Sequence, residues 1–450
     1  MRIAMLSPIG WRTPPRYYGP VETIVSLLTE GLTARGFDVT LFATAESETQ
    51  GKLHAICGKG YEEDKEMYAT VWECLHISEL FERADEFELI HNHFDFLPLT
   101  YSDLVKTPII STIHGLPLPK VLPVYKKYNG KVFYVSISDA DRASELDYIA
   151  TIHYGIDVKN FDFNPSPDNY LLFWGRINQE NGVKVAIEIA RASAKKLIIA
   201  GIIQDEKYYE KYIQPYIDNN NVTFEGAVDS SKSNKLLRNA YAFLAPQNCN
   251  EPSGLSVIES MACGTPVIGF NQGSMPELLK EGENGFLVHN MDEAIKAVNR
   301  VKDIDRFLCR KIVEERFTVD CMIEKYIKEY ETIISKKNSE NHRPWGYYCV
   351  LSDEDTYKAK KIVVFPGKRL SLQRHQKRSE HWHILDGKAR MTLDNEQFTL
   401  VTGESVDIPK HSLHRIENIG TDELSFIEIQ TGDYFGEDDI ERVEDDFGRI

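Results

Sequence analysis

One short stretch of the chain, LSLQRHQKRSEHWHILDG at residues 370–387, is rich in side chains that bind metals. Side chains alternate between the two faces of a β-strand, so Gln373 and His375 share one face of a strand that ends at His375. The polar residues that follow suit a turn, and Glu380 begins the next strand. Across that turn the Glu380 carboxylate can meet the other two side chains, which predicts a cluster of metal ligands.

A later segment, ESVDIPKHSLHRIEN, offers His414 as a further ligand. One carboxylate, two imidazoles and an amide oxygen suit a divalent ion such as zinc, manganese, iron or cobalt. The same alternation turns His381 and His383 to the opposite face from Glu380. For these two residues and for His411, an ordinary structural or solvated histidine is the better interpretation.

The spacing of these residues resembles the two-part signature of the cupins, a family of β-barrels. The matching residues are Gly367, Gln373 (usually histidine), His375, Glu380 and Gly387, then Gly403, Pro409, His414 and Asn418. Within the cupins, RPWGYYCVL, RSEHW and IPKHSLHR are similar to the C-terminal domain of type II mannose-6-phosphate isomerase/mannose-1-phosphate guanylyltransferase. The resemblance covers residues 343–450. It implies an all-β cupin barrel in which Gln373, His375, Glu380 and His414 hold a divalent metal, zinc by preference.

Isomerisation of a hexose 6-phosphate also needs an acid or base and a cation for the phosphate. The candidates for these roles are Arg415, Lys361 and Arg378. Strict alternation turns Arg415 away from the face of His414, so its role requires a local bulge. The similar isomerases usually carry arginine where Lys361 stands and HHHR where HQKR stands, so metal binding is more firmly predicted than isomerisation.

Composition sets the broad class of the protein. A chain of 450 residues should hold two or three domains. The formal net charge of −17 argues against a nucleic-acid partner, whose phosphates need a basic surface. The seven cysteines form no C-x-x-C pair and are typical of reduced thiols in a cytoplasmic protein. No apolar run approaches the ~20 residues of a transmembrane helix, so we expect no membrane span.

The first 335 residues alternate strands and helices. Residues 3–9, 21–36 and 38–44 form a strand, a helix and a strand, which is a βαβ unit of a parallel sheet. Further strands are predicted at 87–93, 108–115 and 132–138, and a second series at 170–177, 195–201, 221–228, 241–247 and 266–270, with a helix at 183–194. This order predicts two doubly wound α/β halves, whose ligands bind at the carboxyl ends of the strands.

Polar motifs follow several of those strands. EPSGLSVIES places Glu251 and Glu259 around a helix that begins near Leu255, where exposed amides favour a phosphate or a sugar hydroxyl. FWGRINQENG places Arg176 just after a strand, where it can neutralise a departing diphosphate. TIHG places His114 after another strand. Taken singly, each motif also suits a surface ion pair or a structural histidine.

Together and in this order, the motifs resemble the retaining GT-B glycosyltransferases of family 4, over about residues 1–335. The resemblance implies that Glu251 contacts the donor sugar, that Glu259 contacts the ribose and that Arg176 holds the diphosphate, with His114 positioning the reacting sugar. The family's lysine in this loop is Asn181 here, with Lys184 as the candidate to replace its charge, and the usual glycine pair is Gly19-Pro20. The implied catalytic residues are His114, Glu251 and Arg176, and the implied donor-binding residues are Gly19, Arg176, Lys184, Glu251, Ser253, Gly254, Leu255 and Glu259.

The predicted architecture is a GT-B fold, with two Rossmann-like domains that face a cleft, followed by a C-terminal cupin barrel. The boundaries are 1–158 for the acceptor-side domain, completed by a returning helix at 318–335; 159–317 for the donor domain; 336–342 for a linker; and 343–450 for the cupin. We predict a bifunctional carbohydrate enzyme, which transfers mannose from GDP-mannose, or a sugar from a UDP-sugar, to an unknown carbohydrate acceptor and acts on a sugar phosphate. Alternatively only one half is catalytic: either the cupin is a sugar-binding module or forms a homodimer, or the GT-B part is a degenerate scaffold.

Overall fold

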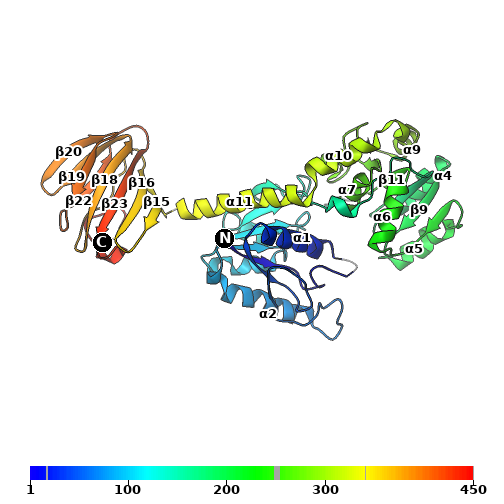
Figure 1. The fold of residues 1–450 in the computed structure, drawn as a ribbon, viewed down its shortest axis with the longest axis horizontal. Helices are drawn as coiled ribbons and strands as arrows, with labels where there is room; N and C mark the ends of the chain where they lie inside the picture. Colours follow the sequence, from blue (N-terminus) through cyan, green and yellow to red (C-terminus); the bar gives the residue numbers. More distant parts are fainter. Residues whose placement is uncertain (17–18, 248–253, 340, 449–450) are drawn as a thin grey trace. The chain divides into compact units, whose positions relative to one another are not determined.

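The structure is a computed structural model that describes residues 1–450 apart from 17–18, 248–253, 340 and 449–450. The chain separates by internal contacts into two units, Met1–Tyr330 and Glu331–Ile450. Each unit is described by itself below, and Figure 1 follows the chain through both by colour.

The first unit begins with a seven-stranded parallel sheet of order β3-β2-β1-β4-β5-β6-β7. Its strands are β1 (Arg2–Leu6), β2 (Asp38–Phe42), β3 (Lys52–His54), β4 (Leu89–Asn92), β5 (Ile109–Ile113), β6 (Phe133–Ser136) and β7 (Tyr148–Thr151), and its helices are α1 (Pro20–Ala34), α2 (Ala69–Glu82) and α3 (Leu122–Lys127). The central strands β4 and β5 are buried along their whole length, as expected for a sheet covered on both faces.

A second parallel sheet of six strands follows, with the order β10-β9-β8-β11-β12-β13. Its strands are β8 (Tyr170–Trp174), β9 (Lys196–Ala200), β10 (Val222–Phe224), β11 (Ala242–Ala245), β12 (Val267–Phe270) and β13 (Gly285–Val288). Its helices are α4 (Val183–Ala192), α5 (Glu206–Tyr212), α6 (Ser230–Asn239), α7 (Leu255–Ala262), α8 (Met275–Leu278), α9 (Met291–Arg300) and α10 (Arg306–Arg316). The two parallel Rossmann-like sheets confirm the predicted fold class.

The sequence does not predict β3, β7 and β13, which all lie at sheet edges. β3 and β7 are short and partly exposed, so they lack the continuous apolar run of a central strand, whereas β13 is a mostly buried run of only four residues, GFLV. The long helix α11 (Val319–Ser339) packs on the first sheet through hydrogen bonds from Tyr326 to Thr112 and between Tyr330 and His91. Residues 336–342, predicted as a linker, instead continue α11 to Ser339 and begin strand β14 at Asn341. A polar last turn of a helix has the same composition as a linker.

The second unit consists of two antiparallel sheets, consistent with the predicted cupin (Figure 1). One contains β14 (Asn341–Arg343), β15 (Gly346–Asp353), β16 (Tyr357–Val364), β23 (Leu424–Gly432), β18 (Arg378–Asp386) and β21 (Ser405–Ile408). The other contains β20 (Glu396–Val401), β19 (Lys388–Leu393), β22 (His414–Asn418), β17 (Leu372–His375) and β24 (Ile440–Glu444). Trp382, Ile384 and Phe426 are fully buried in the core of this unit.

Candidate functional site

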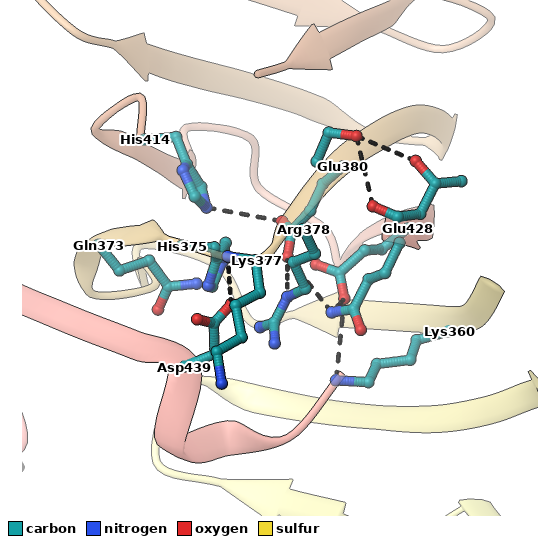
Figure 2. Close-up of polar contacts among 12 residues, drawn as sticks. Lys360, Gln373, His375, Lys377, Arg378, Glu380, His414, Glu428 and Asp439 are labelled. Atoms are coloured by element: carbon teal, nitrogen blue, oxygen red, sulfur yellow. Dashed lines mark hydrogen bonds and ion pairs between the residues drawn. The ribbon is translucent and has the colours of Figure 1, made fainter. Parts of the chain in front are cut away.

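The cupin unit brings His375, Glu380 and His414 together, with one ligand atom of each within 4.8 Å of the others (Figure 2). His375 ends β17, Glu380 lies on β18 and His414 begins β22, so three strands contribute one side chain each. His375 Nε2 lies 3.0 Å from Glu380 Oε1, and His414 Nε2 lies 3.5 Å from Glu380 Oε2. All three side chains are at most 2% exposed.

The hydrogen bonds of the two imidazoles leave nitrogen atoms for a metal. His414 Nδ1 lies 2.9 Å from the Ser412 carbonyl oxygen, to which it can only donate, so Nε2 of the neutral ring carries the lone pair. Within the described chain, His375 Nδ1 has no hydrogen-bond partner, and the Nε2 atoms of His375 and His414 face the Glu380 carboxylate without a well-aligned hydrogen bond. Buried nitrogens without partners are costly unless something binds them. This donor set therefore fits a divalent ion such as zinc.

A buried polar network surrounds the Glu380 carboxylate (Figure 2). Arg378 Nε donates to Glu380 Oε1 at 3.1 Å, and Trp382 Nε1 donates to Glu380 Oε2 at 3.1 Å. Burial alone would raise the pKa of Glu380, but its interactions with His375, His414 and Arg378 outweigh burial and lower that pKa. Glu380 is therefore ionised, the form that a metal ligand requires.

Two further candidates lie beside this cluster. Gln373 on β17 pairs with His414 in register, and its Oε1 accepts a hydrogen bond from Ser371 at 2.7 Å. Arg378, a predicted phosphate-binding cation, is 2% exposed and also donates to the Gly436 carbonyl oxygen. Arg378 therefore contacts Glu380 directly, whereas Gln373 lies on the strand beside His414.

The structure turns the other two isomerase candidates away. Arg415 Nη1 pairs with Glu444 at 3.0 Å, so the alternation that separates it from His414 holds without a bulge. Lys361 is exposed on β16, whereas its neighbour Lys360 extends inward and places Nζ 3.8 Å from Glu428 Oε1. Alternation explains this, because Lys360 lies on the same face as Ile362 and Val364, which belong to the hydrophobic core of the cupin unit.

Two residues of the cupin interior are not predicted from the sequence. Glu428 and Gln430 on β23 are 4% and 1% exposed, and both belong to the network around Glu380. Ile427 and Ile429 alternate with them and lie toward the outside, Ile429 with 37% exposure. If isoleucine is expected inside and glutamate outside, the sequence predicts that Glu428 and Gln430 lie on the outer face, which is the opposite of their place in the structure. The buried charge of Glu380 and burial together raise the pKa of Glu428 to about 8, with burial the larger cause.

In the second parallel sheet, Arg176 follows β8 as predicted, and Asn181 braces its loop. Asn181 Nδ2 donates to the Arg176 carbonyl oxygen at 2.9 Å, and the Asn181 backbone amide donates to Asn178 Oδ1. Lys184 does not replace the family's lysine, because its Nζ lies 3.8 Å from Glu188 Oε1 and over the ring of Tyr212. Its place in the first turn of α4 directs it along the helix rather than toward the loop.

Helix α7 begins as the motif predicts. Gly254, at its N-terminus, has φ 53°, and a Cβ there would lie 2.2 Å from Leu278 Cδ1, so only glycine fits. Leu255 is the first residue of the helix, and burial raises the pKa of Glu259 on the same helix to about 8. Glu251 and Ser253 lie outside the described residues. Gly19 caps α1, where a Cβ would lie 2.8 Å from Glu22 Oε2.

In the first sheet, His114 belongs to a chain of hydrogen bonds. Its Nδ1 lies 2.6 Å from the Tyr154 hydroxyl, and its Nε2 lies 2.9 Å from His93 Nδ1. His91 contacts the hydroxyls of Tyr330 and Thr112 through its two ring nitrogens. Burial lowers the pKa of His114 to about 3, so the ring is neutral. Both of its nitrogens are thus engaged within the protein.

Three parts of the chain match known families. Residues 19–160 match the family described as Glycosyltransferase Family 4, residues 157–315 match glycosyl transferases group 1, and residues 331–445 match the mannose-6-phosphate isomerase C-terminal family. No helix among the described residues is both long and apolar enough to cross a bilayer.

Similar curated proteins match a part of the chain. The alginate biosynthesis protein AlgA of Pseudomonas aeruginosa is 45% identical over 115 residues, which is 26% of this chain and 24% of that protein. A mannose-1-phosphate guanylyltransferase of Klebsiella pneumoniae is 33% identical over 168 residues, 37% of this chain and 33% of that protein. The chain therefore spans a third or less of the length of these relatives.

Solved structures resemble the first unit in fold. Sucrose-phosphate synthase from Thermosynechococcus elongatus has a TM-score of 0.61 and 20% identity, covering 74% of this chain and 99% of that one. Anabaena HepE in complex with UDP has a TM-score of 0.58 and 18% identity, covering 74% of this chain and all of that one. The chain joins a GT-B region of the glycosyltransferase family 4 and group 1 type to a C-terminal cupin domain of the mannose-6-phosphate isomerase type.

Proposed function

We propose that this chain transfers a sugar from a nucleotide sugar to a carbohydrate acceptor, with retention of configuration, and that its cupin interconverts fructose 6-phosphate and mannose 6-phosphate. GDP-mannose is the favoured donor because the cupin relatives are named for mannose 1-phosphate guanylylation. A UDP-sugar is the alternative, since HepE of similar fold was solved with UDP.

The observation that carries the transferase proposal is the start of α7. A left-handed glycine opens the helix, which leaves backbone amides able to bind a phosphate or a sugar hydroxyl. Glu259 lies on the same helix with a pKa raised by burial, so hydroxyl donors of a ribose would favour its ionised form. Arg176, after β8, supplies the cation for the diphosphate. The leaving diphosphate is expected to take the proton of the acceptor hydroxyl.

Nucleotide binding to the full chain tests this proposal. GDP or UDP at a hundredfold excess over its dissociation constant should stabilise the protein by about 2.7 kcal/mol. Arg176→Ala should remove most of this stabilisation, measured by calorimetric melting. Lys184→Ala is the matched control and should leave it unchanged, because Lys184 pairs with Glu188. If neither nucleotide at millimolar concentration changes the melting of the parent protein, the transferase proposal is wrong.

The cupin proposal depends on the ligands His375, Glu380 and His414, with Gln373 beside them. When bound, a divalent ion there would act as a Lewis acid on the sugar oxygens. Arg378 balances the charge of Glu380, and the burial of the residues around the site excludes water. We expect the parent protein to interconvert the two hexose 6-phosphates and His375→Ala to have lost this activity.

Asn181 motivates a second candidate, in which only one half is catalytic. The full chain distinguishes the two candidates, because Arg176→Ala should abolish transfer and leave isomerisation, and His375→Ala should do the reverse. A cupin that binds metal without isomerising would act as a sugar-binding or dimerising module. Asn181→Lys, which restores the second cation, should increase transfer if the donor site is merely weakened.

A further inference from the structure

A pocket of about 600 Å³ lies in the N-terminal domain, at the carboxyl ends of β4 and β5. Segments that follow these two strands form most of its wall, including His93 after β4 and His114 after β5. Pro8, Val21 of α1, Tyr61 and Glu73 of α2 also line it. This is the acceptor-side domain of the proposed transferase, so the chemistry of the pocket bears on the acceptor.

The pocket offers no positive charge. Among the described residues that line it there is no lysine or arginine, whereas Glu73 and Asp95 contribute two carboxyl groups. Burial keeps the pKa of His93 well below its ordinary value and lowers that of His114 to about 3, so both imidazoles are neutral. A phosphate or carboxylate in this pocket would lose its hydration beside like charges, with no cation to compensate.

The rest of the wall is largely apolar. Phe94, Phe96, Leu97 and Ile113 line the pocket, together with Leu116 and Leu118. Leu116 and Leu118 are 44% and 65% exposed, although they are apolar. Large apolar side chains exposed beside a cavity indicate a ligand that covers them with apolar surface of its own.

The two histidines of the wall are held by buried contacts. His93 is 2% exposed, its Nδ1 is bonded to His114 and its Nε2 is buried. The other nitrogen of His114 is engaged by the Tyr154 hydroxyl. His93 and His114 therefore contribute neutral rings to the wall and offer a ligand no accessible cation.

We infer that this pocket binds an uncharged acceptor that carries an apolar group beside its reacting hydroxyl. The inference rests on the proposed transferase function and names the class of its acceptor. An alkyl or aryl glycoside meets these conditions, and a sugar phosphate does not. Leu116 and Leu118 then cover the apolar group, while the bond between His93 and His114 fixes the wall between the two strands.

Equilibrium binding to the full chain tests the inference without requiring turnover. The probes are methyl and octyl glycosides of mannose, glucose and galactose, below the micellar range of the octyl compounds, and the matching sugar 6-phosphates. Calorimetric titration should show that one octyl glycoside binds at least about tenfold more tightly than its methyl counterpart, as burial of even about two methylene groups implies. The sugar 6-phosphates should show no binding at the same concentrations.

Variants of exposed residues avoid the risk of misfolding. Leu118→Asp should weaken the octyl glycoside about tenfold, whereas Leu104→Asp should not, because Leu104 is 76% exposed and lies outside the pocket lining.

Three results would overturn the inference: no binding of any octyl glycoside, a sugar 6-phosphate that binds as tightly as one, or a Leu118→Asp variant that binds like the parent. Failure of the transferase proposal appears separately, as the absence of nucleotide binding. A protein that prefers octyl glycosides but binds no nucleotide would contradict transfer and still support the uncharged, apolar character of the pocket.

Discussion

Among the described residues, buried histidines cluster in the N-terminal domain and in the cupin, and the two clusters differ in what their ring nitrogens contact. In the N-terminal domain, His93 and His114 bond to each other, His114 also contacts the Tyr154 hydroxyl, and His91 contacts the hydroxyls of Tyr330 and Thr112. In the cupin, the ring nitrogens of His375 and His414 approach a buried carboxylate instead. Burial alone therefore gives neutral imidazoles that hydroxyl groups can satisfy, whereas a buried carboxylate converts a histidine pair into a candidate metal site.

The largest expected effect concerns metal content. We expect about one zinc ion per chain, with at least about a hundredfold loss of affinity in His414→Ala, because three protein ligands are the minimum for such a site. Elemental analysis of the purified protein measures it. His383→Ala is the matched control: His383 lies on the same strand as Glu380 but bonds to Ser405 on the other face. Equal zinc content in His414→Ala and His383→Ala would contradict a metal site in the cupin cluster.

Acid should destabilise the N-terminal cluster. Burial lowers the pKa of His114 from 6.5 to about 3, so between these values the unfolded chain binds a proton that the folded chain does not. Stability from this residue is complete above pH 6.5 and falls as the pH decreases toward 3. At pH 5 the loss should be about 2 kcal/mol relative to neutral pH.

Hydrogen exchange of the β4 and β5 amides at about pH 5 and pH 7.5 can follow this loss. In His114→Asn the part of the pH dependence that comes from this residue should disappear, since asparagine does not titrate. A pH dependence equal to that of the parent would show that His114 titrates normally.

Tyr330→Phe should cost about 1.5 kcal/mol, because it leaves His91 Nδ1 buried without its 2.6 Å hydroxyl partner. Tyr326→Phe should cost less, because Thr112 keeps its bond to His91 when the Tyr326 hydroxyl is removed. Denaturant unfolding of the two variants compares them. Equal losses of unfolding free energy in the two variants would mean that His91 Nδ1 finds another hydrogen-bond partner.

The sequence predicts the two parallel sheets and the ligands of the cupin because the relevant signals are local. Buried parallel strands are continuous apolar runs, and strand alternation with one turn brings His375 and Glu380 together, whereas His414 is assigned from the resemblance to the cupins. The polar interior of β23 and the engagement of His114 by Tyr154 and His93 depend on distant segments. The local sequence pattern does not predict these contacts, and the alternation of β23 would place its isoleucines, rather than Glu428 and Gln430, in the interior.

The smallest expected effect tests which lysine of β16 belongs to the cupin interior. The Lys360 side chain is 12% exposed, with Nζ 3.8 Å from Glu428 and over the ring of Tyr348, whereas Lys361 is exposed. Lys360→Met keeps most of the aliphatic packing but removes the cation, so it should cost about 1 kcal/mol of unfolding free energy. Lys361→Met should stay within about 0.5 kcal/mol of the parent, as expected of a surface substitution. Denaturant unfolding of the two single variants at neutral pH gives the comparison, and an equal or larger loss in Lys361→Met would reverse the assignment of the two faces.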